Sequence, residues 1–114
     1  MSAITTHVLD TARGEPASGV HVRLERLRDD NAWLELGDGF TDADGRVVPL
    51  VSEDLTLSAG HYRLTFETGR YYADVGTAGF YPVVQIVFHI RNPGEHHHVP
   101  LLLSPFGYTT YRGS

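Results

Sequence analysis

Short strand-like runs, each closed off by turn-forming residues, constrain this chain more than any other feature of its sequence. The runs at residues 4–10, 20–27 and 60–67 are rich in β-branched residues or alternate between apolar and polar side chains. Glycine, proline, aspartate and asparagine separate the runs, as at residues 92–94. With further short strands at residues 32–36, 83–90, 95–103 and 106–111, seven or eight strands are expected. This pattern predicts an all-β fold, a two-sheet β-sandwich with one short helix.

Several boundaries follow from individual residues. The glycines within residues 37–39 are expected to end the strand at 32–36, and Asp44 with Gly45 predicts a tight turn that leads into an extended segment, residues 46–50. A slip in the alternation at Leu27 predicts a bulge or the end of that strand. Thr68 is expected to cap the short helix.

The run at residues 83–90 is apolar on both faces, unlike the other strands. A strand of this kind is normally covered on both sides. Because the chain is small, we expect a partner subunit to supply the second cover.

Length and composition exclude several classes of protein. With 114 residues the chain is expected to form a single domain, residues 1–114, and without cysteine it has neither disulfides nor thiolate chemistry. The net charge of −5 argues against nucleic acid or an anionic membrane as the main partner. Residues 1–3 lead directly into a strand pattern without a targeting segment, and no apolar run approaches the ~20 residues of a membrane span. A cytoplasmic location is therefore expected.

A histidine triplet precedes the apolar run near the end of the chain. In a strand, His96 and His98 share one face about 7 Å apart, and His97 points to the other face. Two imidazoles at this spacing could share a proton or a water, or could chelate Zn²⁺. No cysteine is present and Glu95 points to the other face, so we expect no functional metal and no cofactor.

These residues also carry a family resemblance. The sequence at residues 98–105, the following Gly107 and Tyr108, and the final four residues resemble the 5-hydroxyisourate hydrolase family, the transthyretin-related branch of urate breakdown. The resemblance extends to the segments at residues 6–19, 41–46, 62–64 and 80–82 and so covers nearly the whole chain. One departure is His97, where the family usually has an aromatic residue, most often tyrosine.

The resemblance implies a transthyretin-like (prealbumin-like) sandwich and hydrolysis of the N1–C6 amide of 5-hydroxyisourate, which gives 2-oxo-4-hydroxy-4-carboxy-5-ureidoimidazoline. It implies that the catalytic residues are His7, Arg46 and His98. It also implies that the substrate is bound by the final residues, Tyr111, Arg112, Gly113 and Ser114. We expect the histidines to activate water and Arg46 to stabilise the oxyanion. The family further implies a homotetramer, a dimer of dimers with sites between subunits.

Two other functions remain open on the sequence alone. Transthyretin itself shares the sandwich and the Leu-Leu-Ser-Pro segment, so a non-catalytic carrier of a small aromatic ligand is the main alternative. The histidine and arginine set and the final Tyr-Arg-Gly-Ser favour the enzyme. A structural or carbohydrate-facing sandwich module is supported by fold class only. His21, His61 and His89 are expected to have no role in catalysis.

Overall fold

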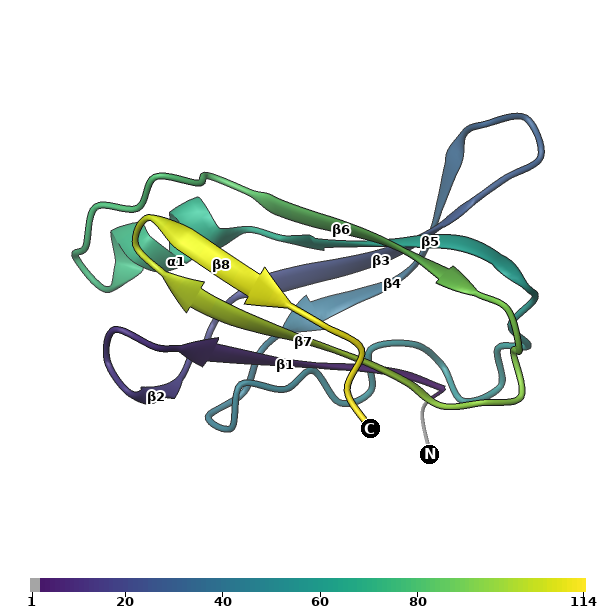
Figure 1. Ribbon diagram of the computed structural model, residues 1–114, viewed down its shortest axis with the longest axis horizontal. Helices are drawn as coiled ribbons and strands as arrows, with labels where there is room; N and C mark the ends of the chain where they lie inside the picture. Colours follow the sequence, from purple (N-terminus) through teal and green to yellow (C-terminus); the bar gives the residue numbers. More distant parts are fainter. Residues whose placement is uncertain (1–2) are drawn as a thin grey trace.

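The computed structural model describes residues 3–114 and arranges eight strands of this part of the chain into two four-stranded sheets. The strand order is β2-β1-β7-β8 in the first sheet and β4-β3-β5-β6 in the second, and the two sheets face each other (Figure 1). Met1 and Ser2, which the sequence places before the first strand, lie outside the described residues. The elements in chain order are β1 (Ile4–Asp10), β2 (Glu15–Pro16), β3 (His21–Leu27), β4 (Trp33–Phe40), β5 (Gly60–Phe66), α1 (Thr68–Asp74), β6 (Val84–Ile90), β7 (His97–Ser104) and β8 (Gly107–Thr110).

The expected two-sheet sandwich with one short helix is therefore confirmed. Alternate residues of each strand point into the space between the sheets, as the period of two requires. In β1 the buried side chains include Ile4 and Val8, while in β5 Tyr62, Leu64 and Phe66 are fully buried. These residues form one apolar core that holds the outer faces of both sheets in fixed positions.

The parallel pairing of β1 with β7 determines where the candidate site lies. Thr5 pairs with His98 and His7 with Pro100, so the start of the chain and its last third share one sheet. The end of the chain also returns to the region where β1 begins (Figure 1). Segments about 90 residues apart in sequence are thus placed side by side.

The expected break at residues 37–39 is wrong, because β4 continues through these glycines to Phe40. A Cβ atom on Gly37 would collide with the backbone oxygen of Leu50, and one on Gly39 would come within 2.6 Å of Val47 Cγ1. Both glycines allow the segment around Val47 and Leu50 to pack tightly against β4. Their role is close approach within a strand rather than termination of that strand.

Strand β3 ends at Leu27, one of the two meanings predicted for the slip in the alternation there. A shift of register also occurs between Leu24 and Glu25, where Leu36 of β4 has no partner on β3. After the tight turn, Arg46 makes an isolated bridge to His7, and residues 47–50 belong to no strand. The strand expected from residue 95 begins at His97.

The helix is present, but Thr68 does not cap it. Glu67 is the N-cap residue and makes no side-chain capping bond, whereas Thr68 is the first helical residue. The Thr68 hydroxyl instead donates a 2.7 Å hydrogen bond to the carbonyl oxygen of Tyr81. It therefore ties α1 to the segment before β6. After α1, Gly76 has a φ of 71°, which is typical of the residue just beyond a helix end.

Strand β6 is an edge strand whose outer face is open in the single chain. Val87 is 57% exposed, and Gln85 and His89 on the same face are also exposed, so this face is mixed in character and has no cover from the same chain. The expectation that a partner subunit covers it stays a prediction. Between residues 3 and 114, no helix has the length and apolar character needed to cross a bilayer.

Candidate active site

The outer face of the β2-β1-β7-β8 sheet brings together His7, Arg46 and His98. Thr5 and His7 are half-buried on this face of β1, while Ile4, Thr6 and Val8 are buried on the other. His98 lies opposite Thr5 on β7, and is also half-buried. Since His7 and His98 are diagonal neighbours on adjacent strands, their side chains are within reach of the same small molecule.

A tight turn brings Arg46 to this face. The turn is held by Asp42, whose carboxylate accepts hydrogen bonds from the backbone amides of Asp44 and Arg46 at 2.9 and 3.1 Å. Gly45 has a φ of 78°, and a Cβ atom there would collide with the carbonyl oxygen of Val8. Only glycine suits this position, as the Asp44–Gly45 pattern predicts. The hydrogen bonds of the turn and the bridge to His7 therefore fix the backbone of Arg46 next to His7, and the Arg46 side chain is exposed.

His98 is the most constrained of the three groups. Its Nδ1 atom is 2.8 Å from the hydroxyl oxygen of Thr5. Burial lowers the pKa of His98, and the positive charge of Arg46 and the neighbouring His96 and His7 lower it further. A lowered pKa keeps the imidazole neutral at physiological pH, which is the state that can accept a proton.

His96 lies on the same side as His98, as the spacing of two predicts. The ring centroids are 6.4 Å apart, and His96 Nε2 is 2.9 Å from the Thr5 hydroxyl oxygen. In the described part of the chain, no group of three or more histidine, aspartate or glutamate side chains is placed to hold a metal ion.

The final residues divide between two faces of the sheet. Gly113 meets the site directly, because its amide donates a 2.8 Å hydrogen bond to the His98 carbonyl oxygen. Tyr111 and Arg112 instead line a cavity of about 260 Å³ between β6 and the ends of β7 and β8. Ser114 is exposed just beyond Gly113. Within one chain, only part of the predicted substrate-binding tail therefore converges on His98.

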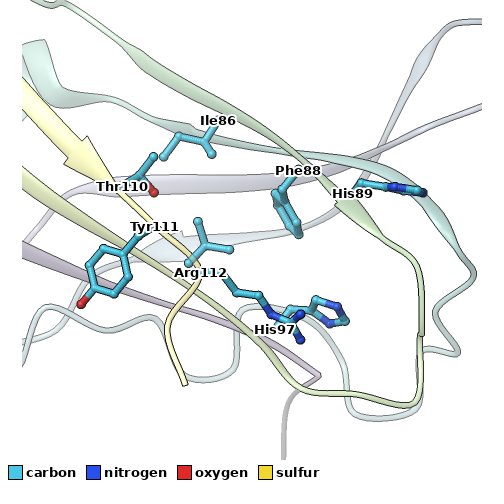
Figure 2. Close-up of a pocket in the computed structure, with 8 residues that line it drawn as sticks. Ile86, Phe88, His89, His97, Thr110, Tyr111 and Arg112 are labelled. Atoms are coloured by element: carbon cyan, nitrogen blue, oxygen red, sulfur yellow. The ribbon is translucent and has the colours of Figure 1, made fainter.

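Figure 2 shows the cavity lined by Tyr111 and Arg112, with Ile86 and Phe88 on one side and Arg112 reaching toward His97. Arg112 also makes a 2.9 Å ion pair with Glu95. His97 is only 5% exposed, and its Nδ1 atom has no hydrogen-bond partner among residues 3–114. Burial lowers the pKa of His97, and the charge of Arg112 acts in the same direction. His97 does point away from His98, as expected.

One member of the site was missed in the sequence. Thr5 contacts two histidines of the cluster, His96 and His98, yet it is not among the residues that the sequence motifs predicted for the site. The available signal was that same period of two, since Thr5 and His7 necessarily share a face. Its two histidine partners, in β7 and just before it, depend on the register between two distant strands, which the sequence alone does not give.

Taken together, the fold and the cluster define a transthyretin-like sandwich with two histidines and an arginine on one sheet face. The model of the HIUase/Transthyretin family matches residues 4–113, and the chain belongs to this family. The family resemblance seen in the sequence motifs is therefore confirmed.

Three known proteins illustrate the relationship. The 5-hydroxyisourate hydrolase of Caulobacter vibrioides is 48% identical over 118 aligned positions, which cover 100% of both chains. The structure of Klebsiella pneumoniae 5-hydroxyisourate hydrolase superposes with a TM-score of 0.83 at 41% identity, covering 99% of this chain and 100% of that one. Transthyretin from Sparus aurata superposes with a TM-score of 0.92 at 33% identity, covering 99% and 97%.

Proposed function

We propose that this protein hydrolyses 5-hydroxyisourate to 2-oxo-4-hydroxy-4-carboxy-5-ureidoimidazoline in urate breakdown. The observation that carries the proposal is the joint position of His7, Arg46 and His98 on one sheet face. Support also comes from relatives named 5-hydroxyisourate hydrolase that are nearly half identical over almost the whole chain.

In this mechanism, neutral His98 removes a proton from the attacking water and His7 orients that water. The lowered pKa of His98 suits a base that works near neutral pH. Arg46 carries a permanent charge with planar donors, and it stabilises the oxyanion that develops when water attacks the ring carbonyl. The protonated histidine then returns its proton to the leaving ring nitrogen. The reaction needs no metal or organic cofactor.

The proposed substrate-binding residues of the tail fall into two pairs. Gly113 and Ser114 lie beside His98, whereas Tyr111 and Arg112 lie away from it. Tyr111 and Arg112 line a cavity on the other side of their own sheet. We therefore place the complete site between copies of the chain in a homotetramer, a dimer of dimers. The open face of β6 and the exposed aromatic residues around β8, Phe106, Tyr108 and Tyr111, support such an assembly.

A fully active monomer in light scattering would contradict this placement of the site. A cytoplasmic location and a single domain over residues 1–114 remain predictions alongside it.

The second candidate is a non-catalytic carrier of a small aromatic ligand. It is favoured by the TM-score with Sparus aurata transthyretin, which exceeds that with the Klebsiella pneumoniae enzyme. Sequence identity runs the other way, at 41% with the enzyme and 33% with transthyretin. Because function depends on site residues rather than on backbone shape, we rank the enzyme first.

A direct assay separates the two candidates. Urate oxidase generates 5-hydroxyisourate in the cuvette, and its ultraviolet decay is followed with and without the protein. The enzyme accelerates this decay, and His7→Ala, Arg46→Ala and His98→Ala each remove most of the acceleration. His61→Ala is the control, because His61 lies on the other sheet and is exposed. A decay rate equal to the spontaneous one with the wild-type protein would support the carrier.

A further inference from the structure

The hydroxyl group of Thr5 lies between two imidazole rings. Its oxygen is 2.8 Å from Nδ1 of His98 and 2.9 Å from Nε2 of His96, and both are hydrogen-bond distances. A hydroxyl has one proton and two lone pairs, so it can donate to only one of these nitrogens. The proton positions on the two rings are therefore linked through Thr5.

Three arrangements satisfy this geometry. In the first, Thr5 donates to His96 and accepts a proton from Nδ1 of His98, which leaves Nε2 of His98 unprotonated. In the second, Thr5 donates to Nδ1 of His98, so the proton of neutral His98 must lie on Nε2. In the third, both rings donate to Thr5, and its own proton then has no acceptor among residues 3–114.

The first and third arrangements both leave Nε2 of His98 with a free lone pair, but only the first also gives the Thr5 proton an acceptor. No described residue forms a hydrogen bond with its Nε2 atom, so that nitrogen is open to a water or a substrate. In the second arrangement the lone pair of Nδ1 is occupied by Thr5, and Nε2 carries a proton. His98 could not then act as a base. His96 is exposed, so water can satisfy its remaining N–H group in the first arrangement.

We propose that Thr5 is a positioning residue that holds neutral His98 in the Nδ1–H tautomer, with His96 as the acceptor at the far end. This inference rests on the proposed function, in which His98 is the base. The titratable or charged groups that act on His98 are His7 from β1, Arg46 from the tight turn and His96 from the segment before β7. Thr5 differs from all three because it has no charge and contacts Nδ1 directly.

The test uses Thr5→Val, which keeps the branched shape and removes the hydroxyl, and Thr5→Ser, which keeps the hydroxyl. Nitrogen-15 NMR of the whole protein reports which ring nitrogen of His98 carries the proton. We expect Nδ1–H in the wild type and in Thr5→Ser, and mainly Nε2–H in Thr5→Val. We also expect Thr5→Val to lower kcat by about tenfold with little change in KM, since a misplaced proton removes the general base.

Thr6→Val is the matched control. Thr6 is the next residue on β1, and its buried hydroxyl donates a 2.6 Å hydrogen bond to the Val99 carbonyl oxygen on the other face of the sheet. Its loss should lower stability and leave the His98 tautomer unchanged. A loss of kcat that merely reflects weaker β1–β7 packing would therefore appear in Thr6→Val as well.

The proposal is overturned if wild-type His98 carries its proton on Nε2, or if either the tautomer or kcat is unchanged in Thr5→Val. A wild-type protein without hydrolase activity would reject the proposed function. Because the NMR measurement needs no turnover, the tautomer assignment is decided separately in that case.

Discussion

The backbone of Gly113 lies against the imidazole ring of His98. A Cβ atom added to Gly113 would come within 2.5 Å of His98 Cδ2 and within 3.2 Å of Cγ. The Gly113 amide is at the same time tied to the His98 carbonyl oxygen, so the backbone of the tail cannot easily move away. The orientation of the ring therefore depends on the absence of a side chain at residue 113.

Gly113→Ala is accordingly expected to turn the His98 ring and to lower kcat/KM by about tenfold or more, because small displacements at a reacting group are costly. The melting temperature should change little, since Gly113 lies outside the core. Gly107→Ala is the control; its nearest neighbour, Ser104 Oγ, would be 3.6 Å from the new Cβ atom, an ordinary contact. Wild-type kinetics in Gly113→Ala would show that the ring is not held in this way.

The pH dependence of activity should report the lowered pKa of His98. Burial and the charge of Arg46 favour neutral His98, so kcat/KM should stay constant as the pH falls past about 6.5, the ordinary histidine pKa. Activity is lost only at lower pH, where His98 gains a proton. Arg46→Gln removes one cause of the shift and should move the acidic limb of the residual activity to higher pH. An acidic limb above pH 6.5 in the wild type would contradict the assignment of His98 as base.

Acid stability should depend on His97. Its folded-state pKa is lowered, first by burial and then by Arg112, so between that pKa and about 6.5 the unfolded chain binds a proton that the folded chain does not. The stability associated with neutral His97 is thus present above about pH 6.5 and is lost as the pH falls through the folded-state pKa. His97→Phe should reduce the loss of unfolding free energy on acidification, measured by urea titration at several pH values. An equally steep loss in the variant would exclude His97 as its source.

Two adjacent tyrosines of α1 offer a matched test of buried hydroxyl groups. Tyr71 donates a 2.6 Å hydrogen bond to the buried carboxylate of Asp10; burial and this bond raise the pKa of Tyr71 to about 12. The Tyr72 hydroxyl is buried without a hydrogen-bond partner among residues 3–114. Tyr71→Phe should destabilise the protein by about 2 kcal/mol, whereas Tyr72→Phe should be neutral or slightly stabilising.

Urea unfolding of the two variants measures this difference. Equal losses of unfolding free energy in the two variants would mean that the hydrogen bond between Tyr71 and Asp10 does not stabilise the protein.

The sequence predicted best those features that depend on local alternation. The core face of β5 could be assigned from Tyr62, Leu64 and Phe66, because a strand has only two faces and one of them was apolar. The positive φ at Gly45 followed from the Asp-Gly turn in the same way. Both conclusions needed information from only a few neighbouring residues.

The errors arose where a residue's role depends on a distant partner. Gly37 looked like a strand terminator, but its actual constraint is the backbone of Leu50, thirteen positions later. Thr68 looked like a helix cap, but its hydroxyl binds Tyr81. At the site, motif resemblance named His7, Arg46 and His98, and β1–β7 pairing with the bridge from Arg46 brings them together. The separation of Arg112 from His98 could not be predicted, because it depends on how the chain leaves β8.

The pairing of β1 with β7 also affects the order of events during synthesis. Thr5 leaves the ribosome long before His98, 93 positions later, so a nascent chain holds β1 with only the two-residue β2 beside it. Non-local parallel pairing of this kind forms slowly, and an unpaired strand edge can recruit other chains. A chain interrupted before residue 97 would keep that edge open, and we expect such fragments to aggregate.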